Sequence, residues 1–122
     1  MATITDEYMR ERLVHTRPYT VVLLRRTATY RRPEVDAIVW EHGRRNFSLR
    51  ADGDLAVVLP VTSEPGDLAG IGIFTGMPEE VALLMDADPG VVAGIFTYEI
   101  VSVRGFPGDG LPARADRGAD AT

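Results

Sequence analysis

The sequence predicts an α+β domain with the ferredoxin-like order β-α-β-β-α-β, preceded by a short helix. Four short runs rich in β-branched and aliphatic residues alternate with two longer segments in which apolar residues recur at helical spacing. Clusters of Gly, Pro and Asp separate these segments. The chain has 122 residues, which suits one domain. This order of elements is expected to form a four-stranded antiparallel sheet with two helices on one face.

The first half of the chain contributes a short helix, a strand and a long helix. Thr5 is a suitable N-cap followed by two acidic residues, which predicts a short N-terminal helix. The run 20–24, TVVLL, is β-branched or aliphatic at successive positions, which is typical of a strand covered on both faces. Pro33 suits the first turn of a helix that we expect to continue to about Arg50. That helix should end where Gly53 can adopt a left-handed conformation.

The second half of the chain contributes two strands, a helix and a last strand. The segment LAVVLPVT predicts a strand, and Pro60 indicates that it lies at a sheet edge or contains a bulge. In the strand LAGIGIFT, Gly70 and Gly72 leave one face without side chains, where a ligand or another backbone can approach. The segment MPEEVALLMDADP predicts a helix that begins near Pro78 and stops before Pro89. The last strand is expected within VVAGIFTYEIVSVRGF.

The two ends of the chain are expected to lie outside the domain. Residues 107–122 are rich in Gly, Ala, Asp and Pro and carry almost no apolar bulk, which predicts a flexible tail. We therefore divide the chain into a helical extension (1–18), the domain (19–106) and the tail (107–122).

Composition excludes several classes of function. A net charge of -5 argues against a nucleic-acid partner, because phosphate binding needs a concentrated basic surface. Arginine pairs such as Arg25-Arg26 and Arg44-Arg45 are interpreted as a solvated rim, with an anion-binding patch as the alternative. The absence of cysteine excludes disulfides and thiolate chemistry. No apolar run is long enough to span a membrane and no signal peptide is recognisable, so a cytoplasmic location is expected.

The apolar strands also predict how the sheet is completed. Their near-continuous apolar character requires a cover on the face opposite the helices. A second copy of the same sheet would supply that cover, so we expect a homodimer.

The first main helix carries a histidine on its apolar side. At 100° per residue, six positions fall within one arc of about 100° that should face the sheet. His42 and Asn46 are its only polar members, and the other four are Val35, Ile38, Val39 and Leu49. Burying an unpaired polar group costs about 1–3 kcal/mol, so His42 needs a partner or a solvated cavity. It is either a core histidine bonded to a backbone carbonyl or a proton-transfer residue that lines a pocket.

Three other residues of this helix need an explanation. Gly43 costs about 1 kcal/mol relative to alanine in a helix, so we expect another segment to pack closely against it. Trp40 and Phe47 form a second apolar stripe. That stripe is expected to pack against the N-terminal helix or a partner chain, and a cofactor platform is the alternative.

Several motifs occur in an order that resembles the YCII-related (YciI-like) family. They are His42, then Gly53-Asp54-Leu55 through Pro60, then Asp88-Pro89, Ala93-Gly94, Val101, Val103 and Phe106. The resemblance covers roughly residues 19–106 and implies membership of the dimeric α/β-barrel superfamily, in which two ferredoxin-like sheets close face to face. It also implies that His42 and Asp88 form an active-site pair. One such relative is a dehydrochlorinase acting on a hydroxylated chloro-aromatic. The sequence departs from the usual pattern in lacking Arg-Pro before the histidine and in having Gly90 after Asp-Pro.

Asp88 can also be interpreted without the resemblance. Pro89 excludes residue 88 from helical conformation, so its carboxylate should lie at the exit of the preceding helix. A negative charge is unfavourable at a helix C-terminus, so a cationic partner such as a protonated histidine is expected. The alternative is an Asx-type turn before Pro-Gly.

These observations lead to a functional hypothesis with two rivals. We expect a small homodimeric enzyme that isomerises a cyclic or hydroxylated aromatic small molecule or eliminates a group from it. His42 and Asp88 would be catalytic, and Asn46, Gly70 and Gly72 would shape the ligand site. No cofactor or metal is expected, because the chain has no phosphate-binding glycine loop and no clustered metal ligands. The rivals are a non-catalytic dimeric module that binds a small molecule or another protein, and a subunit that docks into an assembly through Trp40 and Phe47.

Overall fold

The computed structural model describes residues 1–63 and 66–113. Residues 114–122 of the expected tail lie outside this described part. The helices and strands are, in chain order, α1 (Asp6–Leu13), β1 (Arg17–Arg26), α2 (Asp36–Ala51), β2 (Leu55–Pro60), β3 (Leu68–Phe74), α3 (Pro78–Asp86), α4 (Pro89–Val92) and β4 (Phe96–Gly105).

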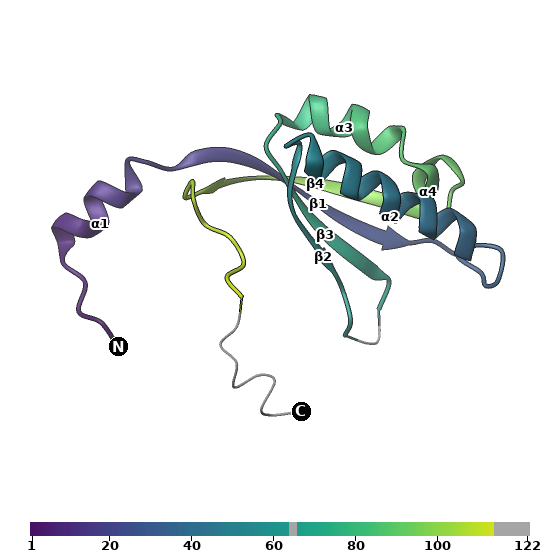
Figure 1. Cartoon of the computed structure of the whole chain (residues 1–122), viewed down its shortest axis with the longest axis horizontal. Coiled ribbons are helices and arrows are strands. Elements are labelled where there is room, and N and C mark those ends of the chain that lie inside the picture. Colours follow the sequence, from purple (N-terminus) through teal and green to yellow (C-terminus); the bar gives the residue numbers. More distant parts are fainter. Residues whose placement is uncertain (64–65, 114–122) are drawn as a thin grey trace.

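The four strands form one antiparallel sheet in the order β2-β3-β1-β4. Val22 of the central strand β1 lies between Gly72 of β3 and Ile100 of β4. Helices α2, α3 and α4 all lie on one face of this sheet (Figure 1). The structure therefore confirms an α+β chain with a four-stranded antiparallel sheet, an architecture compatible with the ferredoxin-like order. Pro60 lies on an edge strand, as predicted.

The core fills the space between the helices and the sheet. Alternate residues of β1 point into it, because successive side chains of a strand point to opposite faces. Val22 and Leu24 are buried there. The hydroxyl of buried Thr20 donates to the carbonyl oxygen of Gly76 at 2.8 Å, so this polar group is satisfied. The remaining members of the core are Val35, Leu49, Leu55, Phe74, Val81, Met85, Ile95 and Phe96.

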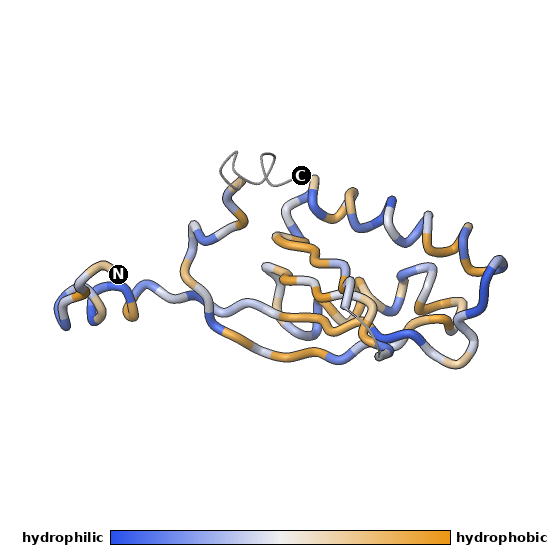
Figure 2. The backbone as a smooth tube through the Cα atoms, turned by 90° about the horizontal axis from the view of Figure 1, so that it is seen from below, coloured by the Kyte–Doolittle hydropathy of each residue, from blue (hydrophilic) through white to orange (hydrophobic). Residues whose placement is uncertain are grey.

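The opposite face of the sheet carries hydrophobic residues without a helical cover. Val21 lies between Ile73 and Val101 in the sheet register, and all three are at least partly exposed. Figure 2 shows hydrophobic residues concentrated along the strands. Among the described residues, helices cover one face only, and the expected cover of the other face by a second copy of the chain stays a prediction.

Two element boundaries differ from the expectation. β4 begins at Phe96, because residues 89–92 form the short helix α4, which was not predicted. α2 begins at Asp36 rather than Pro33, because residues 32–35 form a turn. Gly53 does adopt the expected left-handed conformation after α2, with a φ of 86°.

The N-terminal helix α1 lies apart from the rest of the molecule. The amide of Tyr8 donates to the hydroxyl of Thr5 at 3.1 Å, so the predicted N-cap is confirmed. α1 buries none of its residues and projects away from the sheet and the other helices (Figure 1). In the described part of the chain, no helix combines the length and the apolarity needed to cross a membrane.

Candidate functional site

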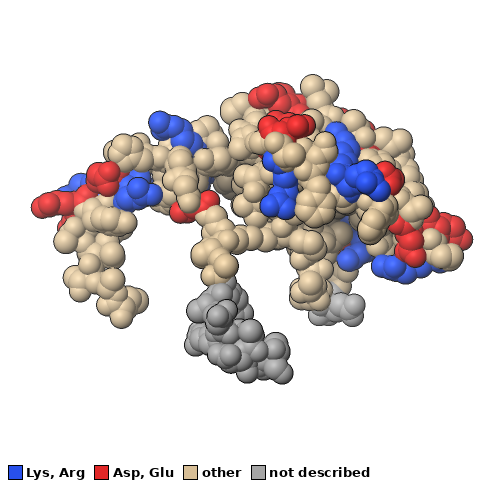
Figure 3. All heavy atoms as spheres, in the orientation of Figure 1, with Lys and Arg blue, Asp and Glu red and all other residues tan. Residues whose placement is uncertain are grey.

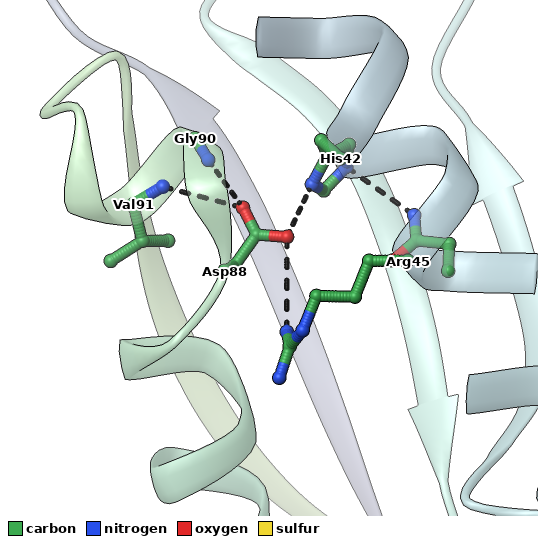
Figure 4. A network of polar contacts seen from close by, with 6 residues as sticks. His42, Arg45, Asp88, Gly90 and Val91 are labelled. Carbon is green, nitrogen blue, oxygen red and sulfur yellow. Dashed lines mark hydrogen bonds and ion pairs between the residues drawn. The ribbon is translucent and has the colours of Figure 1, made fainter. Parts of the chain in front are cut away.

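The structure brings His42 and Asp88 together. His42 lies on the face of α2 that points toward α4, and its Nδ1 is 2.7 Å from Oδ1 of Asp88 (Figure 4). The histidine side chain is 13% exposed and the aspartate side chain is 1% exposed. The two residues are 46 positions apart in sequence, so only the packing of α4 against α2 places them in contact.

Asp88 is held by the helix that follows it. Its backbone is extended, as the following proline requires, and its Oδ2 accepts from the amides of Gly90 at 2.9 Å and Val91 at 3.3 Å. The carboxylate therefore caps the N-terminus of α4, where the helix dipole favours a negative charge. Asp88 follows the C-terminus of α3, as expected, and the N-terminus of α4, which was not predicted, offsets the unfavourable position of its charge. The Asx-type turn and the pairing with His42 occur together.

The glycine after Asp-Pro has a steric explanation. A Cβ atom on Gly90 would lie 2.3 Å from Cδ2 of Phe96, closer than any real contact allows. The Phe96 ring therefore requires glycine at this position. The same ring lies beside His42, with their centroids 5.0 Å apart.

Hydrogen bonding keeps Asp88 ionised. Burial by itself raises the pKa of this carboxyl group. The hydrogen bond and the charge interaction with His42, together with the amides of Val91 and Gly90, outweigh burial and bring the pKa of Asp88 below its usual value. Asp88 is therefore a hydrogen-bond acceptor at neutral pH, and the histidine atom facing it carries the proton.

Arg45 belongs to this cluster, although the sequence analysis assigned it to a solvated rim. Its Nη1 is buried, lies 3.9 Å from Oδ1 of Asp88 and has no hydrogen-bond partner among the described residues. Figure 4 shows its side chain extending from α2 toward the carboxylate. Helical periodicity could have indicated this position, because it places Arg45 only about 20° outside the inward arc, next to Ile38.

Asn46 lies one helical turn from His42. Its Nδ2 is 3.3 Å from Nε2 of the imidazole. With the Nδ1 proton donated to Asp88, Nε2 carries a lone pair that can accept from this amide. When the imidazole is protonated at Nε2, this nitrogen can donate to the amide oxygen of Asn46, provided that the side-chain amide flips by 180°. Asn46 can therefore stabilise both protonation states of the ring.

A pocket of about 360 Å³ lies between α2 and the sheet, beside these residues. His42 and Asn46 line it from the helix, and Gly70 and Gly72 line it from β3, as predicted. A Cβ atom on Gly72 would lie 3.1 Å from the Phe74 ring, so glycine keeps this part of the wall open. The rest of the lining is mainly apolar and includes Val22, Leu24, Val39, Leu55, Val58, Met85 and Phe96.

Two polar residues of this pocket, Arg26 and Tyr30, were not predicted from the sequence. Arg26 follows Val22 and Leu24 at the alternating spacing of β1, so strand periodicity could have placed it on the inner face. Tyr30 lies in the loop after β1, where no periodic pattern indicates an orientation.

The other residues singled out on α2 lie differently from the expectation. Nothing approaches within 4 Å of a Cβ atom built on Gly43, so the expected close packing is wrong, and the residue borders the pocket instead. Trp40 and Phe47 are exposed, at 70% and 66%, and line a second groove on the outer side of α2. α1 does not cover them (Figure 1). Figure 3 shows arginine and acidic side chains interspersed over the face it displays.

Comparison of the chain with protein-family models and with curated proteins finds no match. The resemblance to the YCII-related family therefore stays a prediction that rests on the motifs quoted above. Among the described residues, no group of three or more His, Asp or Glu side chains is placed to hold a metal ion.

Proposed function

We propose that this protein is a small enzyme that moves protons on a cyclic or hydroxylated aromatic molecule, with isomerisation or elimination as the outcome. The observation that carries the proposal is the 2.7 Å contact between His42 and the buried carboxylate of Asp88 at the edge of a mainly apolar pocket. A neutral imidazole with its Nδ1 proton donated to a carboxylate has a basic Nε2 on its other side. The Asn46 amide lies 3.3 Å from this nitrogen, so a substrate has to displace that amide to reach Nε2.

His42 is the proton-transfer residue in this proposal. Its Nε2 takes a proton from an acidic C–H or O–H group of the substrate, and the released electron pair forms a new C=C or C=O bond. In an isomerisation, the same nitrogen returns the proton to another atom. In an elimination, a leaving group such as chloride departs with its bonding electrons. Asp88 orients the ring and stabilises the imidazolium that forms.

The shape of the pocket supports an aromatic or cyclic substrate. Its volume of about 360 Å³ lies at the small end of the range for ligand sites, about 300–1,000 Å³. The walls are mainly aliphatic and aromatic, and few polar side chains line the pocket. Such a lining lowers the local dielectric constant, which strengthens the interaction between the imidazolium and the carboxylate.

A homodimer is part of the proposal. The outer face of the sheet carries an apolar surface formed by Val21, Leu23, Val57, Ile73 and Val101. A second copy that packs its own sheet on this surface would give the dimeric α/β barrel implied by the resemblance. Val101→Arg should yield a monomer by light scattering, and Leu83→Arg on exposed α3 should leave the mass unchanged. A monomeric wild-type chain would exclude the barrel.

The test of catalysis measures proton transfer with defined probes. The wild-type chain, His42→Gln, Asp88→Asn and His15→Gln are incubated in D₂O with phenylpyruvate, and deuterium incorporation at C3 is followed by NMR. Chloride release from chlorohydroquinone tests elimination. We expect the wild type to accelerate one of these reactions and His42→Gln to lose about 10²–10⁴-fold of that acceleration. His15→Gln should keep the wild-type rate, because His15 lies on the exposed segment after α1.

A second candidate function is a non-catalytic module that binds a small molecule. The observation in its favour is that Asp88 already caps α4, so its contact with His42 also serves as a structural tie between α2 and α4. This candidate predicts that both probes bind while the wild type accelerates neither reaction. It also predicts that His42→Gln keeps the affinity of the wild type.

A further inference from the structure

We propose that the pocket recognises a carboxylate group of its ligand through Arg26, so that the substrate is an aromatic or cyclic carboxylate. This inference rests on the proposed function for the part that His42 plays. The recognition itself depends only on the charge, position and surroundings of Arg26.

Arg26 is directed into the pocket by the alternation of β1. Its neighbour Arg25 points to the opposite face, where it pairs with Asp67 at 3.0 Å and with Glu99 at 2.5 Å. Arg26 is partly buried, lines the pocket and makes no ion pair with a described carboxylate. The structure thus contains two adjacent arginines, of which one is neutralised on the outer face and the other is available to a ligand.

The electrostatics of the pocket favour an anion. Arg26 and His42 are the only ionisable side chains with a positive form among its described lining residues, and the lining contains no Asp or Glu. An unpaired guanidinium in an apolar wall loses part of its hydration, and an incoming anion compensates for that loss. The chain as a whole is acidic, so this local positive charge is not a general property of its surface.

Aromatic rings connect Arg26 with His42. The guanidinium of Arg26 lies 5.5 Å from the ring centroid of Tyr30, and that ring lies 5.7 Å from the ring of Phe96. Phe96 in turn contacts the ring of His42, at 5.0 Å between centroids. A flat ligand can therefore lie along the aromatic wall with its anionic group at Arg26 and its reacting atom near His42.

A carboxylate fits this site better than a phosphate. The planar guanidinium forms two parallel hydrogen bonds with a carboxylate, and its single charge matches that of one carboxylate group. A phosphate carries more charge and usually requires several backbone amides at a glycine-rich loop or a helix N-terminus. The described lining of this pocket offers one arginine and neither of these features.

The test compares benzoate with benzamide, which have nearly the same shape and differ in charge. Dissociation constants are measured by NMR titration at pH 8 on the wild type, Arg26→Met, Arg26→Lys and the matched control Arg25→Met. We expect benzoate to bind the wild type about 10–100-fold more tightly than benzamide. The preference should vanish in Arg26→Met, persist in part in Arg26→Lys and remain complete in Arg25→Met. In the wild type it should also weaken as salt is added.

The assignment would be overturned by equal affinity for the two probes or by no detectable benzoate binding at millimolar concentration. It would also be overturned by a preference that survives in Arg26→Met, or by tighter binding of phenyl phosphate than of benzoate. If Arg26→Met fails to fold, Arg26→Lys and the salt dependence still decide the question. His42→Gln separates this inference from the proposed catalysis. If His42→Gln retains the preference for benzoate over benzamide, the Arg26 site is supported even where proton transfer is absent. If His42→Gln loses that preference, the anion is assigned to His42 instead.

Discussion

The described part of the chain contains two histidine–carboxylate pairs, which differ in exposure, in sequence separation and in distance. His15 lies just after α1 and pairs with Glu11, one helical turn away, at 3.3 Å. Both of these side chains are more than half exposed. His42 pairs with Asp88 at 2.7 Å across two helices, and the aspartate is fully enclosed. The chemical groups are alike, so the surroundings alone distinguish the two pairs.

This difference shows what burial adds to an ion pair. Around His15, water screens the charges and competes for every hydrogen bond, so the pair contributes little. Around His42, the carboxylate is oriented by two amides, the ring contacts Phe96, and the residue lines a pocket. Only the second arrangement has the geometry that acid–base chemistry requires.

Removal of the Asp88 carboxylate should give the largest change in stability. Asp88→Ala leaves the amides of Gly90 and Val91 without their acceptor and leaves His42 without its partner. We expect a loss of about 3 kcal/mol in the free energy of unfolding, measured by urea denaturation at pH 7. A loss below about 1 kcal/mol would contradict the view that this pair ties α4 to α2.

The pH dependence of stability should differ between the wild type and Asp88→Asn. Folding lowers the pKa of Asp88, so the ionised carboxylate stabilises the folded state at pH values above about 4, the range of an unfolded aspartate. This stabilisation is lost as the pH falls through the lower pKa of the folded protein. In urea denaturation from pH 7 to pH 2.5, the advantage of the wild type over Asp88→Asn should therefore shrink below about pH 4. A constant difference would mean that the charge of Asp88 contributes nothing.

Gly43→Ala should stabilise the fold by about 0.5–1 kcal/mol and weaken ligand binding. The added methyl group meets nothing within 4 Å and removes a glycine from the interior of α2. Since Gly43 borders the pocket, the methyl group should also narrow the space beside His42. Thermal denaturation and benzoate titration measure the two effects. Gly53→Ala is the control and should destabilise the fold, because Gly53 has a φ of 86°.

The exposed pair should give the smallest change. Glu11→Gln removes the partner of His15 in a setting where both side chains are solvated. We expect a change below about 0.5 kcal/mol in the free energy of unfolding. A larger loss would show that α1 packs against something in solution, such as a second copy of the chain.

The fold was largely predictable because its signals are local. Val22 and Leu24 belong to a run whose composition indicates a strand, and Thr5, Gly53 and Pro60 mark element ends at short range. The helix α4 was not predictable, because a four-residue turn has no period of its own. Its presence gives Asp88 a second role, because the residue lies at the exit of α3 and also caps the N-terminus of α4.

The candidate site was predictable only in part. Helical spacing indicated that His42 and Asn46 share the inward face of α2, and the structure places both at the pocket. Arg45 was missed because its charge suggested solvent exposure, yet its Nη1 is buried. Tyr30 was missed because loops carry no periodic signal.

By itself, the sequence determined the strands, the two main helices and the inward direction of His42, since each depends on residues a few positions apart. Tertiary structure alone decided that Arg26 and Tyr30 share the pocket of this ring and that Gly43 faces open space. It also brings Asp88 to the ring, a contact that the sequence indicated only through the resemblance and through the need for a cationic partner. The reason is physical: spacing along a helix or strand sets the direction in which a side chain points. What it then meets depends on how segments distant in sequence pack together.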